Sequence, residues 1–218
     1  MVLLSCAIGK KEQSMIKLTW NYHSHTNYTD GFHTIEEIAR YCDDNGIEEL
    51  AITEHVRKEL TYDFKQLLLD INQTSARFKV HILTGVEAKI LPDGALDCPE
   101  EIRKKVDIVI GSVHGLGGMT EQEAYEKLAG SDCMIIGHPQ FYNEKIIASL
   151  VTTGKIVELS NRYEQSEEMI KEFKNAGLLF SIGLDSHRLE DFDDFGQLEE
   201  LIEKLELHDR LWRFTPHR

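Results

Sequence analysis

Residues 16–25, IKLTWNYHSH, join a largely apolar run to two histidines. The run predicts a β-strand over residues 16–22, and His23 and His25 stand two residues apart at its end. Because successive side chains of an extended strand point to opposite faces, these two histidines leave the same face and can share one ion. A single such pair is more often an ordinary surface or core pair, so it indicates a metal site only if the pattern recurs.

The same kind of run recurs six times along the chain. Further strands are predicted over residues 49–53, 80–86, 106–113, 133–137, 155–159 and 178–184. Amphipathic helical stretches separate them, and two of these open with a capping-box pattern, at Thr34 and Thr120. Gly46 and Gly177 stand where helix C-caps belong. Strands that alternate with helices indicate a parallel α/β fold, either an open sheet or a closed barrel.

Residue types that bind metals end nearly every predicted strand. In chain order they are His23 and His25, Glu54 and His55, Glu87, His114, His138, and Asp185 and His187. In a barrel these groups converge on one rim, whereas an open sheet spreads them along an edge, so a barrel is favoured. Taken alone, each of these residues has an ordinary explanation other than metal binding: a charge exposed to solvent, or a buried histidine whose hydrogen bonds are made within the protein. Chance does not explain six of ten histidines at strand ends.

Six short motifs carry a family resemblance. They are YHSHT (22–26), AITEH (51–55), TGVE (84–87), IGSVH (110–114), IGHP (136–139) and LDSH (184–187). In this order they resemble the motif series of the PHP (polymerase and histidinol phosphatase) family, over residues 18 to about 190. The resemblance implies a distorted (β/α)7 barrel with a trinuclear metal site. We expect one such domain over residues 16–218, after an N-terminal tail of residues 1–15.

The resemblance also implies which residues hold each ion. His23, His25, Glu87 and Asp185 would hold the first; Glu87, as a bridge, with His114 and His138 the second; Asp30, His55 and His187 the third. Some family members have His where this chain has Asp30, which makes His33 a lesser alternative. Many members have Asp where this chain has Asn21, and that departure puts in doubt the orientation of the first histidines rather than a ligand.

Imidazole and carboxylate ligands suit Zn, Fe or Mn. Two closely spaced ions can activate a bridging water as hydroxide and stabilise the attacking and leaving oxygens on phosphorus, so no Ser or Cys nucleophile is needed. A phosphate also favours a cation other than the metals. Arg162, beyond the one predicted strand without a ligand, is the first candidate for a substrate-binding residue, and Arg57 and Arg188 are weaker ones. A solvated arginine is the ordinary alternative for all three.

The predicted function is metal-dependent hydrolysis of a small-molecule phosphate monoester. L-Histidinol phosphate is the best-known substrate of relatives of this size. One alternative is a phosphodiesterase or nuclease of the PHP type. A non-catalytic metal-binding regulatory module is the other, and it is disfavoured because all nine ligand positions are filled.

The overall composition is consistent with this function. The 218 residues fit one domain, and 24 Lys and Arg against 38 Asp and Glu give a net charge of -14, which disfavours nucleic acid as a partner. A small phosphorylated substrate remains compatible, because bound cations invert the charge of an acidic pocket. The four scattered cysteines predict reduced thiols in a cytoplasmic protein. No run approaches the ~18 apolar residues of a membrane span. The oligomeric state, the pathway and a start at Met1 or Met15 stay open.

Overall fold

The computed structural model describes residues 15–215 of the chain. The predicted N-terminal tail, apart from Met15, lies outside the described residues. Within them, no helix is long and apolar enough to cross a bilayer.

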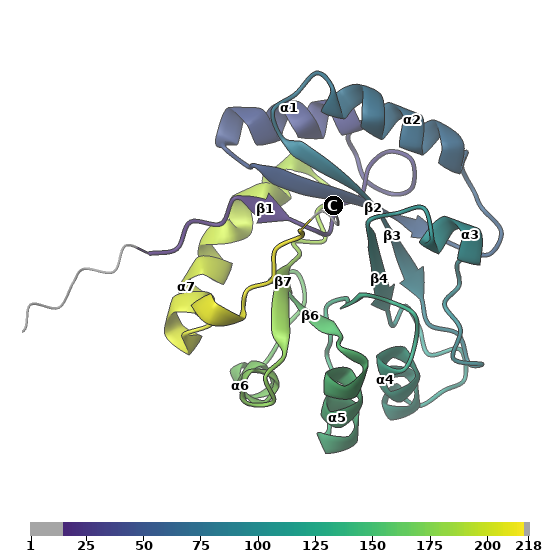
Figure 1. Ribbon diagram of the computed structural model, residues 1–218, viewed down its shortest axis with the longest axis vertical. Helices are drawn as coiled ribbons and strands as arrows, with labels where there is room; N and C mark the ends of the chain where they lie inside the picture. Colours follow the sequence, from purple (N-terminus) through teal and green to yellow (C-terminus); the bar gives the residue numbers. More distant parts are fainter. Residues whose placement is uncertain (1–14, 216–218) are drawn as a thin grey trace, which may run out of the picture.

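Seven parallel strands follow one another around a nearly closed barrel (Figure 1). They are β1 (Trp20–Asn21), β2 (Glu49–Val56), β3 (His81–Lys89), β4 (Ile108–Ser112), β5 (Ile135–Ile136), β6 (Ile156–Leu159) and β7 (Leu179–Ile182). The predicted barrel and all seven predicted strands are therefore confirmed. The first strand is shorter than predicted, because the backbone N–H groups of Ile16 and Leu18 donate to the carboxylates of Glu203 and Glu199 rather than to a neighbouring strand.

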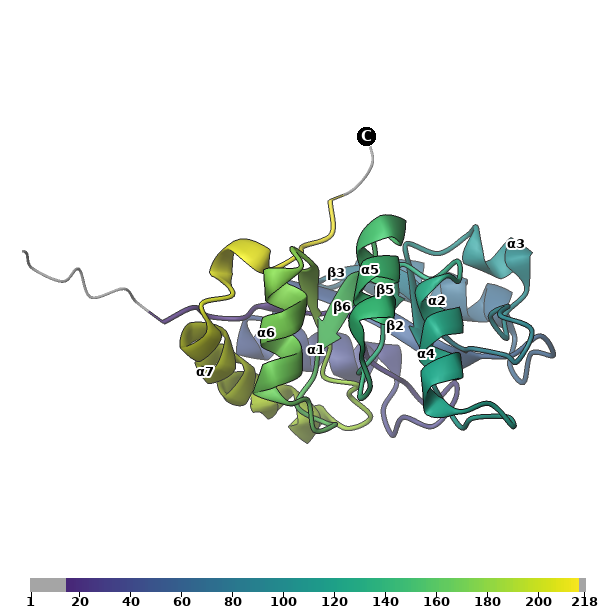
Figure 2. The ribbon, with the colours of Figure 1, turned by 90° about the horizontal axis from the view of Figure 1, so that it is seen from below.

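Helices follow the strands in the chain and form the outer layer. They are α1 (Ile35–Asn45), α2 (Phe64–Ser75), α3 (Glu100–Arg103), α4 (Glu121–Ala129), α5 (Glu144–Thr153), α6 (Glu167–Asn175) and α7 (Phe195–Leu205), with short 3-10 turns η1 (Leu189–Asp194) and η2 (His208–Arg210). Figure 2 shows α4, α5 and α6 side by side on the outside of the strands. Both predicted capping boxes are present, and Gly46 ends α1 in the left-handed conformation that favours glycine, with φ 75°.

The seam between β7 and β1 closes without a regular ladder. The N–H of Tyr22 donates to the carbonyl of Ile182 at 2.9 Å, and Ser24 and Ser186 form an isolated parallel bridge. Asn21, which is fully buried, reinforces the seam: its Oδ1 accepts from the N–H groups of His23 (3.2 Å) and Leu184 (2.9 Å), and its Nδ2 donates to Ser186. Asn21 thus fastens the two ends of the barrel.

Replacing Asn21 by Ala should therefore destabilise the fold. The change leaves two buried N–H groups without an acceptor, at about 1–3 kcal/mol for each. We expect the free energy of unfolding, measured by urea denaturation, to fall by about 2–4 kcal/mol. Asn21→Asp keeps the acceptor oxygen and should lose less. An unchanged denaturation midpoint in Asn21→Ala would show that these bonds do not hold the seam.

Candidate metal centre

The structure brings all nine predicted metal-binding residues together at the C-terminal ends of the strands. Nitrogen–oxygen distances of 2.8 to 3.5 Å link them into one connected cluster. His55 and Glu87 lie near the ends of β2 and β3, six others follow a strand, and Asp30 lies farther along the loop after β1. The convergence arises because the carboxyl ends of parallel barrel strands meet at one rim.

The first group lies deepest and joins His23, His25, Glu87 and Asp185. Four atoms face one another: His23 Nε2, His25 Nε2, Glu87 Oε2 and Asp185 Oδ1, with nitrogen–oxygen distances from 3.0 to 3.5 Å. An ion with tetrahedral bonds of about 2.0–2.1 Å would separate its ligand atoms by about 3.3 Å. All four atoms are buried and have no hydrogen-bond partner. Buried polar atoms are rarely left unpaired, so this arrangement fits a cation.

The second group surrounds the other oxygen of Glu87. Oε1 lies 3.1 Å from Nε2 of His114 and 3.2 Å from Nε2 of His138, and it also accepts from the hydroxyl of Ser112. Burial by itself would raise the pKa of Glu87, but the neighbouring histidines hold it well below its usual value. Glu87 is therefore an ionised carboxylate with histidines at both oxygens, as a bridge between two ions requires.

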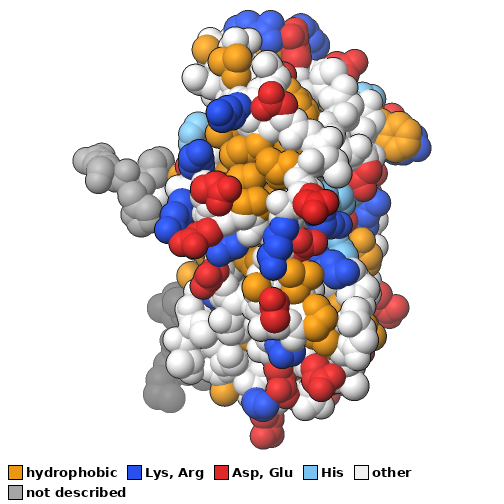
Figure 3. Space-filling view, turned by 90° about the vertical axis from the view of Figure 1, so that its right-hand side faces the viewer, with side chains coloured by type: hydrophobic (Ala, Val, Ile, Leu, Met, Phe, Trp, Pro, Cys, Tyr) orange, Lys and Arg blue, Asp and Glu red, His pale blue; other side chains and the backbone are white. Residues whose placement is uncertain are grey.

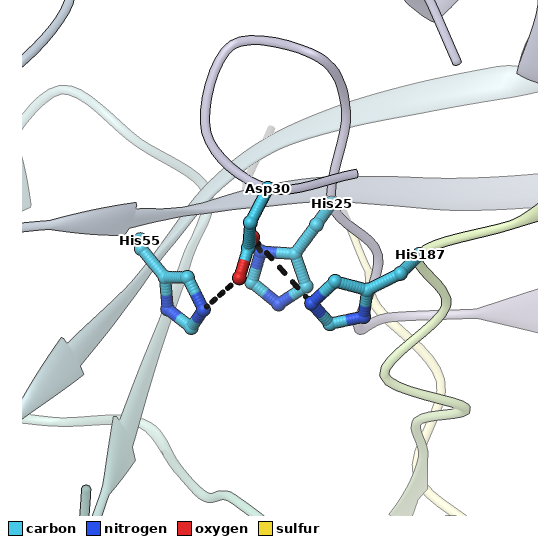
Figure 4. A group of neighbouring side chains, drawn as sticks. All are labelled: His25, Asp30, His55 and His187. Carbon is cyan, nitrogen blue, oxygen red and sulfur yellow. Dashed lines mark ion pairs between the residues drawn. The ribbon is translucent and has the colours of Figure 1, made fainter. Parts of the chain in front are cut away.

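The third group is shown in Figure 4, where Asp30 lies between His55 and His187, with His25 beside them. The carboxylate oxygens of Asp30 lie 3.3 Å from Nε2 of His55 and 3.4 Å from Nε2 of His187. His55 also faces the first group, because its Nδ1 lies 2.8 Å from Oε2 of Glu87. The third group thus adjoins the first two rather than forming a separate site.

Glu158, inside β6, is a functional residue that the sequence analysis missed. Its Oε1 lies 2.8 Å from Nδ1 of His23, and its Oε2 accepts from the N–H of His138 at 2.7 Å. A hydrogen bond at Nδ1 leaves Nε2 of His23 free to face the cluster. Space for Glu158 depends on Gly183, where a Cβ atom would lie 1.9 Å from Oε1. The available signal was a charged residue within the apolar run of residues 156–159.

Glu54 fixes the loop that carries Asp30. This carboxylate is fully buried and accepts from the backbone N–H of Thr26 at 2.8 Å and from the hydroxyls of Thr26 and Thr29. Burial raises the pKa of Glu54 to about 7 although these hydrogen bonds oppose the rise. Asp30 is the one candidate ligand that no strand positions, so its place depends on contacts of this kind.

The three predicted substrate-binding arginines lie in different surroundings. Nε of Arg162 lies 3.1 Å from Oδ2 of Asp185, the oxygen that faces away from the first group. Arg57 donates to the carbonyl of Val56 and lies 3.7 Å from Asp97. Arg188 lies over the ring of Phe32. Of the three, Arg162 is therefore the one that contacts a candidate ligand.

His33, the lesser alternative to Asp30, lies 3.9 Å from Glu37 in α1. Asp30, by contrast, lies between two histidines of the cluster. The geometry therefore favours Asp30 over His33.

The sequence of this chain matches a family model and several known proteins. The family model for the PHP domain matches residues 21–205. A probable phosphatase of Acetivibrio thermocellus is 29% identical across an alignment that covers 88% of this chain and 89% of that protein. DNA polymerase/3'-5' exonuclease PolX of Bacillus subtilis is 29% identical over 197 residues, or 79% of this chain, but the match spans only 35% of PolX.

Among solved structures, the fold resembles histidinol phosphate phosphatase from Lactococcus lactis, which was solved with zinc, L-histidinol and phosphate. The TM-score is 0.68 at 21% sequence identity, over 88% of this chain and 95% of that one. This likeness supports the barrel fold.

Metal binding should release protons at neutral pH. Burial alone would lower the pKa of His23, but the charges of Glu158, Glu87 and Asp185 outweigh it and hold the pKa well above the usual value. The pKa of His55 is likewise raised against burial, by Glu87 and Asp30. Both imidazoles are therefore protonated in the metal-free protein until the pH rises above their raised pKa values, and a metal needs them neutral. Metal affinity should thus fall as the pH falls, beginning above pH 6.5, the ordinary histidine value.

Calorimetric titration of the metal-free protein with Zn²⁺ at pH 7, in two buffers of different ionisation enthalpy, measures this release. We expect at least one proton to be released for each chain that binds metal. His25, whose pKa burial lowers to about 4, should contribute none. Equal heats in both buffers would contradict the assignment.

Proposed function

Because the chain belongs to the PHP domain family and is a metal-dependent phosphoesterase, we propose that it hydrolyses a small phosphate monoester at a centre of three transition-metal ions. The observation that carries the proposal is the carboxylate of Glu87, buried with histidines at both of its oxygens. A carboxylate in that position can join two ions at the spacing that phosphoryl chemistry requires.

The proposed ligand sets follow the three groups. His23, His25, Glu87 and Asp185 would hold the first ion, Glu87, His114 and His138 the second, and Asp30, His55 and His187 the third. Imidazole with carboxylate suits Zn, Fe or Mn. When bound, such ions supply an activated water and neutralise charge on the phosphoryl oxygens.

The remaining residues of the site hold the ligands in place. Glu158 fixes the orientation of His23, and Glu54 fixes the loop of Asp30. Arg162 holds Asp185 through its Nε, and its Nη1 donates to the carbonyl of the same residue at 3.2 Å. We place the remaining guanidinium nitrogen of Arg162 as a donor to a substrate phosphate, because a planar guanidinium can bridge two oxygen acceptors.

Two observations bear on the substrate. The bound L-histidinol and phosphate of the Lactococcus lactis protein make an amino-alcohol monoester such as histidinol phosphate a candidate. PolX, in contrast, is named an exonuclease, which makes phosphodiester hydrolysis the competing activity. On the face in Figure 3, Lys and Arg side chains are interspersed with Asp and Glu rather than gathered into a basic area. The mixed charges on this face and the net charge of -14 do not favour a long polyanion, so the monoester is preferred.

The proposal is tested by comparing the rates at which the metal-loaded protein hydrolyses p-nitrophenyl phosphate, a monoester, and bis(p-nitrophenyl) phosphate, a diester. We expect the monoester to be hydrolysed at least about tenfold faster. Glu87→Ala should lose bound metal and at least about a hundredfold in kcat/KM, because one carboxylate serves two ions. Glu101→Ala removes an exposed carboxylate of α3 and should leave both the bound metal and kcat/KM unchanged. Faster diester turnover would favour the nuclease, and bound metal without turnover of either ester would favour the regulatory module.

A further inference from the structure

Exposed hydrophobic side chains lie on three of the loops that follow the strands. Phe32, Leu60 and Leu116 are 60%, 40% and 40% exposed, and they lie on the loops after β1, β2 and β4. These loops leave the strand ends that carry the cluster.

Phe32 is the largest of the three and is held close to the cluster. It follows Asp30 by two residues, and its N–H donates to the carbonyl of His187 at 2.9 Å. The preceding Gly31 packs so tightly that a Cβ atom there would lie 2.4 Å from the carbonyl oxygen of His25. The backbone that carries Phe32 is thus fixed against two candidate ligands.

Arg188 covers one face of the Phe32 ring. Its guanidinium carbon lies 3.7 Å from the ring centroid, which is the separation of a stacked pair. Phe32 nevertheless remains 60% exposed, so much of its side chain is open to solvent. Stacking on Arg188 orients the ring and leaves an exposed aromatic surface on the loop that carries Asp30.

We propose that the Phe32–Arg188 pair is a stacking platform for a planar organic group of the phosphate ester. The inference rests on the proposed function and names its substrate class: esters of aromatic or heteroaromatic alcohols, in preference to sugar phosphates. A planar group gains stacking with the ring, whereas a polyol does not. The phosphate stays at the metal centre, and the platform receives the part of the substrate that differs between phosphate monoesters.

Binding of phosphonates, which are not hydrolysed, separates the platform from the chemistry. Calorimetry with the metal-loaded protein would compare phenylphosphonate with methylphosphonate. We expect the wild type to bind the phenyl compound at least about 3- to 10-fold more tightly, as aromatic stacking contributes. Phe32→Ala should reduce that preference to less than about twofold without changing the affinity for methylphosphonate, and Phe32→Tyr should restore it. Leu69→Ala, which removes a side chain 46% exposed on α2, is the matched control and should keep the preference.

Each outcome has a distinct meaning. Equal binding of the two phosphonates by the wild type, or a preference that survives in Phe32→Ala, overturns the platform and leaves the phosphatase proposal intact. Failure of both phosphonates to bind the metal-loaded wild type overturns the phosphate site itself, and the platform with it.

Discussion

The carboxylate of Glu87 is the interaction on which the rest of the site depends. Oε2 faces His23, His25 and His55, and Oε1 faces His114 and His138, all within 3.5 Å. A carboxylate that is 1% exposed is costly to bury unless opposite charge compensates it. Five imidazoles from four strands surround it here, and the pKa values of two of them, His23 and His55, are raised. The barrel makes this convergence possible, because parallel strands deliver their carboxyl ends to one rim. Seam contacts such as those of Asn21 then matter for function, since a shift of β7 against β1 would separate His23 from Asp185.

Supporting residues determine how precisely the cluster is held. Glu158 orients His23 from the one strand that supplies no candidate ligand, and the absence of a side chain at Gly183 gives it room. Glu54 performs the corresponding task for Asp30, the candidate ligand that no strand holds. Nε of Arg162 contacts Oδ2, the second carboxylate oxygen of Asp185. Such contacts fix ligand geometry, so mutations at Glu158 or Glu54 should act through the metals rather than on the substrate directly.

The sequence was sufficient to predict the strands, the barrel and the gathering of the nine residues. Eight of the nine lie at or near the end of a recognisable apolar run, and the motif order, which also implied Asp30, matches a family. The sequence was not sufficient for Glu158, whose role depends on a partner 135 positions away along the chain. The predicted first strand was too long, because the backbone N–H groups of Ile16 and Leu18 donate to side chains of α7 rather than to a neighbouring strand. Nor did the sequence reveal that Arg188 lies on Phe32, since that contact joins two loops that only barrel closure brings together.

The central claim is that one cluster, connected through Glu87, holds three ions. Elemental analysis of protein purified without chelator tests it most directly, with the ratio of transition metal to chain as the readout. The account predicts a ratio approaching three, since three groups of ligand atoms are preformed. A ratio near zero, after exposure to Zn²⁺ or Mn²⁺ and removal of the excess, would contradict it.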